Sequence, residues 1–154
     1  MKKNTLSTAL ISIVTLCSAT IAPAHSENIS VTAQDVKKDT QKLLSTLQQY
    51  TVEQRDQAVD GVEQALKKLD QRIDDLEIQI NQNWDDMNQS ARRKAEGSLK
   101  ALRKQRNSLA ERYSGFKNSS TRAWEQMKEG FSDSYQTMSG SLQEAWDEYG
   151  TDSK

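Results

Sequence analysis

The sequence predicts an all-α fold, namely an elongated antiparallel helical hairpin or three-helix coiled-coil bundle. Apolar residues make up only 34% of the 154-residue chain, which suits helices that pack along narrow stripes better than a broad core. The only proline is Pro23, so no proline interrupts a helix after that point. Apolar residues recur at steps of three and four over most of residues 32–149, which is the spacing of one helix face.

The first residues have the composition of a bacterial secretory signal peptide. Lys2 and Lys3 precede a mostly apolar run over residues 6–21, and residues 22–24 (APA) supply the small residues of a signal-peptidase site. We therefore expect cleavage near Ala24 and a periplasmic or secreted mature protein.

Composition excludes most catalytic functions for the mature chain. It keeps no cysteine, and its one histidine is the terminal His25, so neither a disulfide nor a clustered metal site is expected. Adjacent carboxylates such as Asp74-Asp75 and Asp147-Glu148 point in different directions on a helix and do not form an acid–base pair. We expect no enzyme activity, cofactor, small-molecule substrate or nucleic-acid partner.

The chain divides into a signal peptide, a disordered leader, one helical coiled-coil domain and a tail. These parts cover residues 1–24, 25–31, 32–149 and 150–154. Within the domain we expect helices over about 32–83, 90–114 and 119–149.

The first of these helices begins at a capping box formed by Thr32 and Asp35. Thr51 and Gln54 offer a second capping box, which allows a break near Tyr50. Beyond it the apolar steps alternate between four and three, which is the heptad pattern of a coiled coil. This seam comprises Val59, Val62, Leu66, Leu69, Ile73, Leu76 and Ile80.

Residues 81–90 (NQNWDDMNQS) weaken the helical pattern, because Asn and Asp side chains compete for backbone hydrogen bonds. We interpret them as a hairpin corner with Asn88 or Ser90 capping the next helix, and a continuous helix is the alternative. The helix that follows carries Arg106 at a position where an apolar seam residue is expected. We expect it to end at Ser114-Gly115, because glycine readily adopts the left-handed conformation of a C-terminal cap. Its apolar face comprises Ala95, Leu99, Leu102, Leu109, Tyr113 and Phe116. Asn118, Ser119 and Ser120 are candidate caps of the last helix.

The three predicted helices alternate in charge. Residues 31–88 carry seven Lys/Arg and twelve Asp/Glu, residues 90–112 carry eight and two, and residues 123–150 carry one and six. The net charges are therefore −5, +6 and −5, and antiparallel folding would place the basic helix between two acidic ones. The basic run RRKAEGSLKALRKQR could bind nucleic acid or anionic lipid, but a solvated face balanced by acidic neighbours is the favoured interpretation.

The last helix carries an aromatic stripe. Its members follow steps of 3-4-4, an eleven-residue period that keeps the stripe on one face of a nearly straight helix. We take it as the candidate interaction stripe: Trp124, Met127, Phe131, Tyr135, Met138, Leu142, Trp146 and Tyr149.

Three partners could cover this stripe. The first is the chain's own other helices, which is the usual meaning of such a pattern and the interpretation we favour. The second is another copy or a client protein, since aromatic and Met side chains suit adaptable contacts. The third is a lipid surface, although the opposite face is acidic where surface-binding helices are typically basic.

Two motifs within this helix resemble a known family. Ala123, Trp124, Glu125, Met127, Lys128 and Gly130 form AW-E-MK-G, and residues 145–148 form AWDE. This pattern resembles the C-terminal signature of a small bacterial family of exported coiled-coil stress-response proteins with a cyanobacterial founding member. The resemblance covers roughly residues 50–149, with NSSTR replacing the family's Gly-containing approach to the first Trp. The eleven-residue period is also weakly similar to apolipoprotein repeats.

The resemblance implies a helical envelope or stress role and brings no active site. Together with the composition, it leads us to expect a non-enzymatic exported protein with a structural or protective role in the bacterial cell envelope, acting through helix–helix interactions. Possible partners are then the protein itself, as a homo-oligomer, or client proteins. An amphipathic protein that binds lipid surfaces is the alternative.

Overall fold

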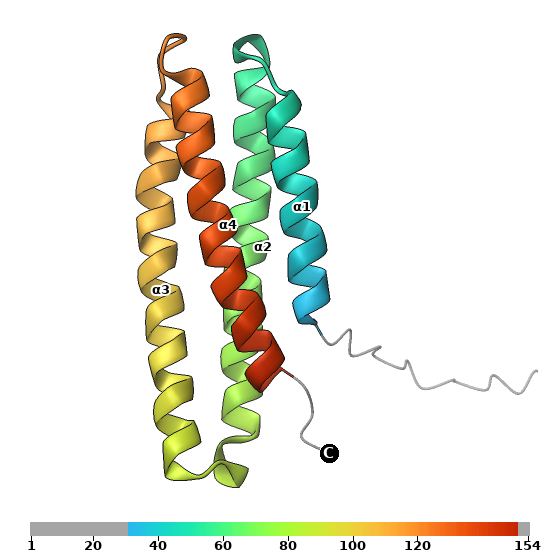
Figure 1. Ribbon diagram of the computed structural model, residues 1–154, viewed down its shortest axis with the longest axis vertical. Coiled ribbons are helices and arrows are strands. Elements are labelled where there is room, and N and C mark those ends of the chain that lie inside the picture. Colours follow the sequence, from blue (N-terminus) through green and yellow to red (C-terminus); the bar gives the residue numbers. More distant parts are fainter. Residues whose placement is uncertain (1–30, 151–154) are drawn as a thin grey trace, which may run out of the picture.

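The computed structural model describes residues 31–150, which form an elongated antiparallel bundle of α-helices (Figure 1). The helices are α1 (Ala33–Gln49), α2 (Arg55–Gln82), α3 (Gln89–Lys117) and α4 (Trp124–Tyr149). Short 3-10 helices at Val52–Gln54 and Trp84–Asp86 precede α2 and α3, respectively. The predicted all-α fold is confirmed. The predicted signal peptide, most of the leader and most of the tail lie outside the described residues.

The first predicted helix is wrong as a single element, because the chain folds back at Tyr50 and separates α1 from α2. Tyr50 and Thr51 both adopt extended backbone conformations, and the Thr51 N–H donates to the Gln54 side chain at 3.3 Å. Reversal lets α1 lie along α4 and bury Val36 and Leu47 in the common core. A straight helix would have left that apolar face without a neighbour.

The hairpin corner at residues 81–90 is confirmed, and the continuous-helix alternative is wrong. The Asn88 side chain caps α3 by accepting the backbone N–H groups of Ser90 and Ala91 at 2.9 and 3.0 Å. Arg92 then reaches back across the corner, where its Nε donates to the Trp84 carbonyl at 3.0 Å. Its guanidinium also lies over the Trp84 ring, 5.3 Å from the centroid.

The boundaries of the last two helices differ from the prediction. α3 continues through Gly115 to Lys117, so Ser114-Gly115 does not stop it. α4 begins only at Trp124, and its N-cap residue, Ala123, provides no side-chain hydrogen bond. The polar residues 118–120 therefore belong to the connection between the helices and do not cap α4.

The core is a narrow seam built on heptads. Leu69, Ile73 and Leu76 of α2 are buried, as predicted. On α3 the buried side chains recur at every seventh residue: Ala95, Leu102, Leu109 and Phe116. So sparse a line suits a helix that is solvated over most of its circumference.

Ion pairs join the acidic side of α2 to the basic helix α3. Asp70 accepts two hydrogen bonds from Arg106, at 2.5 and 2.8 Å, which explains the charged residue on the α3 seam. Heptad-spaced acids on either side of Asp70 complete the ladder, with Glu63 bound to Lys117 at 3.1 Å and Glu77 to Arg103. Each such partly exposed pair contributes only about 0–1 kcal/mol, but their register favours this pairing of helices.

Candidate functional site

The α4 stripe packs inside its own chain. Trp124 is 1% exposed and Trp146 is 4% exposed, so both indoles are shielded. Met127 is the exception in the stripe, with 37% of its surface exposed. The other buried members are Phe131, Tyr135, Met138, Leu142 and Tyr149. Contact with the chain's own helices, the first of the three predicted partners, is therefore the arrangement in the structure.

The buried positions of α4 follow a heptad rather than the predicted eleven-residue period. Ser139 and Ala145 are buried although neither was assigned to the stripe. With Met127 left out, three buried lines each repeat every seven residues. The first contains Trp124, Phe131, Met138 and Ala145, the second contains Tyr135, Leu142 and Tyr149, and the third contains Ser139 and Trp146. The helix thus presents a coiled-coil face to the bundle.

The end of the stripe near the α3–α4 connection forms an aromatic cluster. Phe116 lies 4.9 Å from Trp124 and 5.5 Å from Phe131, measured between ring centroids. Phe131 also meets Tyr135 at 5.9 Å and Tyr113 at 6.5 Å. Contacts at these separations add about 0.5–1.5 kcal/mol each to the burial of the rings. This cluster fixes α4 against α3 at one end of the bundle.

The α4 face also buries polar atoms that find no protein partner. Seven buried side-chain nitrogen or oxygen atoms in the described chain lack a hydrogen bond, and four belong to α4. Those four are the Nε1 atoms of Trp124 and Trp146, the Ser139 hydroxyl and the Tyr149 hydroxyl. An unpaired buried polar group costs about 1–3 kcal/mol. Ser139 and Tyr149 still have hydroxyl neighbours, in Tyr135 and Ser98 respectively, so this cost falls mainly on the two indole N–H groups.

A polar cluster joins α1 to the middle of the bundle. Arg72 of α2 is buried and donates to the Asp39 carboxylate of α1, which also lies 2.7 Å from the Lys68 ammonium. Tyr135 of α4 lies beside this pair. Burial raises the pKa of the Tyr135 hydroxyl to about 12, and the Asp39 charge adds to the increase. The centre of the α1 contact is thus polar rather than apolar.

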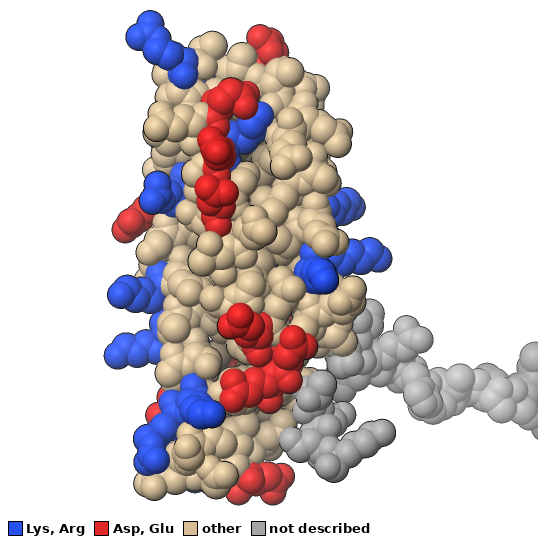
Figure 2. Space-filling view, viewed as in Figure 1, with Lys and Arg blue, Asp and Glu red and all other residues tan. Residues whose placement is uncertain are grey.

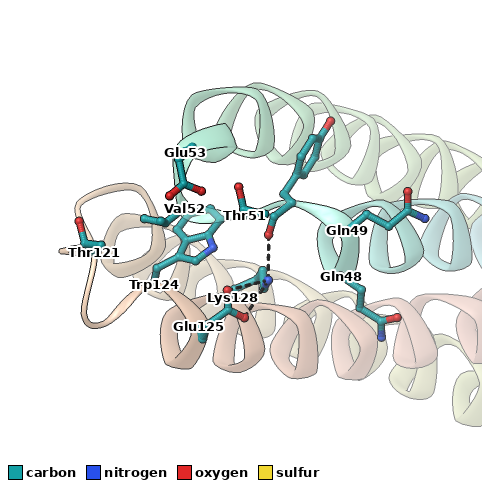
Figure 3. Close-up of a pocket in the computed structure, with 10 residues that line it drawn as sticks. Gln48, Gln49, Thr51, Val52, Glu53, Thr121, Trp124, Glu125 and Lys128 are labelled. Carbon is teal, nitrogen blue, oxygen red and sulfur yellow. Dashed lines mark hydrogen bonds and ion pairs between the residues drawn. The ribbon is translucent and has the colours of Figure 1, made fainter.

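A shallow cavity of about 380 Å³ lies at the loop end of the bundle, where the α1–α2 turn meets the start of α4 (Figure 3). Its lining includes Gln48, Thr51, Glu53, Trp124 and Lys128. The Lys128 ammonium is already engaged, since it donates to the Tyr50 carbonyl at 3.0 Å and to Glu125 at 3.1 Å. These contacts make the cavity a structural junction that holds the turn against α4.

Neither a clustered metal site nor a membrane-spanning helix is found within residues 31–150. No group of three or more His, Cys, Asp or Glu side chains in this range is placed to hold a metal ion. The helices between these residues include none that is long and apolar enough to span a membrane.

Comparison of the chain with known proteins identifies no similar protein. No protein-family model matches the chain, and no curated protein or solved structure matches it either. The resemblance to the stress-response family therefore stays an interpretation of residues 123–130 and 145–148.

Proposed function

We propose that the protein is a non-enzymatic component of the bacterial cell envelope with a structural or protective role, acting through helix–helix interactions. The observation that supports this best is the placement of the α4 stripe beneath α1, a short helix with few buried residues. α1 buries three side chains in 17 residues, whereas α2 buries nine in 28. One of the three is the polar Thr40. α3 covers the other side of the stripe, so α1 is the part of its cover that is held by the fewest buried apolar side chains.

Partner contact through this stripe requires α1 to move. Among large apolar side chains of the described region, only Ile78 and Met127 are exposed, and two isolated residues are too small a patch for client binding. α1 packs mainly on α4, so its displacement would uncover part of the stripe. An amphipathic helix from a client, or from another copy, would then fit the vacated seam.

A pair of matched substitutions tests this mechanism. Leu47→Ala weakens the apolar anchor of α1, whereas Leu109→Ala makes the same truncation on α3, and both leucines are 1% exposed. We expect the Leu47→Ala variant to suppress the aggregation of an unfolded test enzyme more strongly than the unsubstituted protein does. Leu109→Ala, which lowers stability without releasing α1 specifically, should give the smaller effect.

Light scattering of the test enzyme, with helical circular dichroism as a check on folding, provides the measurement. Equal suppression by both variants would show that general destabilisation exposes the apolar surface. No suppression by either variant would contradict the client-binding role.

Lipid binding through the stripe is the second candidate function. It is favoured by the unpartnered Nε1 atoms of Trp124 and Trp146, because such side chains find partners at a boundary that is apolar on one side and wet on the other. Flotation with neutral phosphatidylcholine vesicles tests it. Binding by Leu47→Ala but not by Leu109→Ala would promote this candidate over client binding.

A further inference from the structure

The outward face of α3 carries a line of cations that we call the α3 ridge, consisting of Arg93, Lys100 and Lys104. These residues are exposed, and at 3.6 residues per turn they project within about 40° of one another. The line lies roughly opposite the buried heptad of α3, so it forms the crest of the helix. None of the three makes an ion pair with another described residue.

No ion pair to a neighbouring helix neutralises the ridge, because the acids of α2 that face α3 bind other cations of that helix. Arg103, Arg106 and Lys117 face α2 and carry the three ion pairs of the ladder. No ion pair within residues 31–150 links α3 to the acidic helix α4. Figure 2 shows the result, with blue side chains projecting from the α3 flank while red ones gather over α4. The predicted balance of the basic run by both neighbours is therefore found on one side only.

We propose that the α3 ridge docks the closed bundle onto the surface of an anionic lipid bilayer. Three cations that point the same way from one straight helix can reach the plane of anionic headgroups together. The span from Arg93 to Lys104 is about 16 Å at 1.5 Å per residue, comparable to two or three headgroups. Each Lys or Arg held near an anionic leaflet strengthens binding about fivefold, so three strengthen it about 100-fold.

A bilayer fits this ridge better than a nucleic acid does. The exposed face of α3 offers no aromatic side chain between the ridge residues for base stacking. Exposed acids also lie on the neighbouring helices, with Asp74 and Asp75 on α2 and Asp147 and Glu148 on α4, and Glu96 of α3 lies one turn before Lys100. A flat surface that touches only the crest avoids much of their repulsion, whereas a polyanion that wraps the bundle would meet it.

This inference goes beyond the proposed function, because it uses the outer face of the closed bundle and needs no release of α1. It also differs from lipid binding through the stripe, which is apolar and would not require anionic headgroups. The lipid composition of the vesicles therefore separates the two modes.

Vesicle cosedimentation of the mature chain with two charge-matched triple variants tests the ridge. The ridge variant replaces all three ridge residues with Gln. The control variant also removes three unpaired, exposed cations, but from α1 on the other flank of the bundle (Figure 1). The control substitutions are Lys37→Gln, Lys38→Gln and Lys42→Gln. Helical circular dichroism confirms that both variants are folded.

We expect the unsubstituted protein to bind phosphatidylglycerol-containing vesicles at low salt, to bind pure phosphatidylcholine vesicles much less and to dissociate at high salt. The partition coefficient should fall about 100-fold in the ridge variant and much less in the control variant. An equal fall in both variants, or no binding to phosphatidylglycerol vesicles at low salt, would overturn the proposal. Preference for duplex DNA over vesicles at equal phosphate concentration would overturn the choice of a bilayer.

Discussion

Truncation of Leu76 to alanine tests the α2 seam most directly. Leu76 is 0% exposed, and Ile78, two residues further along the same helix, is 54% exposed. Leu76→Ala and Ile78→Ala therefore remove aliphatic side chains of similar size from the two sides of one helix. A packed bundle and a solvated single helix make opposite predictions for this pair.

The expected loss at Leu76 follows from its complete burial. Leu→Ala substitutions in packed cores cost about 2–5 kcal/mol, including the cavity that remains. We expect about 3 kcal/mol here, since a narrow seam between solvated helices can relax in part. For a bundle of about 120 residues the entropy of unfolding is roughly 0.25 kcal/mol/K, so Tm should fall by about 12 °C. Ile78→Ala should change the free energy of unfolding by less than about 0.5 kcal/mol, because alanine favours the helix and little surface is lost.

Urea and thermal unfolding followed by helical circular dichroism measure both quantities. The urea m-value should stay the same in the two variants, which would show that the substitution acts on the folded state. A loss below about 0.5 kcal/mol for Leu76→Ala, or equal losses for the two variants, would refute a packed α2 seam in solution.

Three further predictions concern the buried Tyr135, the Asp70–Arg106 ion pair and the N-terminus of the mature chain. Burial holds the pKa of Tyr135 at about 12 against 10.0 for a free tyrosine, so the folded state keeps the proton that the unfolded state releases, and stability should fall by about 2 kcal/mol as pH rises from 10 to 12. Tyr135→Phe should remove this part of the decline in urea unfolding, and an unchanged slope would contradict it. A double-mutant cycle of Asp70→Asn and Arg106→Gln should give a coupling free energy of about 0.5–1 kcal/mol. Zero coupling would mean that the ion pair contributes nothing to stability. N-terminal sequencing of protein from the periplasm should begin at His25, and intact cytoplasmic protein with its first methionine would exclude the envelope role.

The helical class and the α2–α3 hairpin could be predicted because their signals are local. Heptad spacing marks α2, and the cap at Asn88 lies within three residues of the backbone groups that it binds. The reversal at Tyr50 was harder, since the apolar rhythm continues through a stretch with no glycine or proline. Part of what holds it is a hydrogen bond from Lys128, 78 residues away in sequence. The Thr51–Gln54 capping box is the only local sequence signal that we found for the reversal.

The period of the α4 stripe was misjudged for a different physical reason. Counting only large apolar residues includes Met127, which is exposed, and omits Ser139 and Ala145, which are buried. Small residues occupy positions where helices approach closely, so they carry as much information on the packed face as aromatic ones. A count of hydrophobic residues gives small residues little weight. Because of this, the sequence predicts an eleven-residue repeat where the buried residues follow a heptad.

The net charge of a segment also leaves out information that the structure supplies, because it does not show which charged side chains are paired. The sequence shows that α3 is basic, but only the ion pairs distinguish Arg106, bound to Asp70, from the free Lys100 and Lys104. With the stripe sealed, the accessible chemistry of the closed bundle is charge, so its binding should weaken as salt screens the ridge. Binding through the stripe depends instead on release of α1 and on apolar contact, which salt does not weaken. The salt dependence of any partner's affinity, measured for the unsubstituted protein and for Leu47→Ala, therefore identifies the surface that the partner uses.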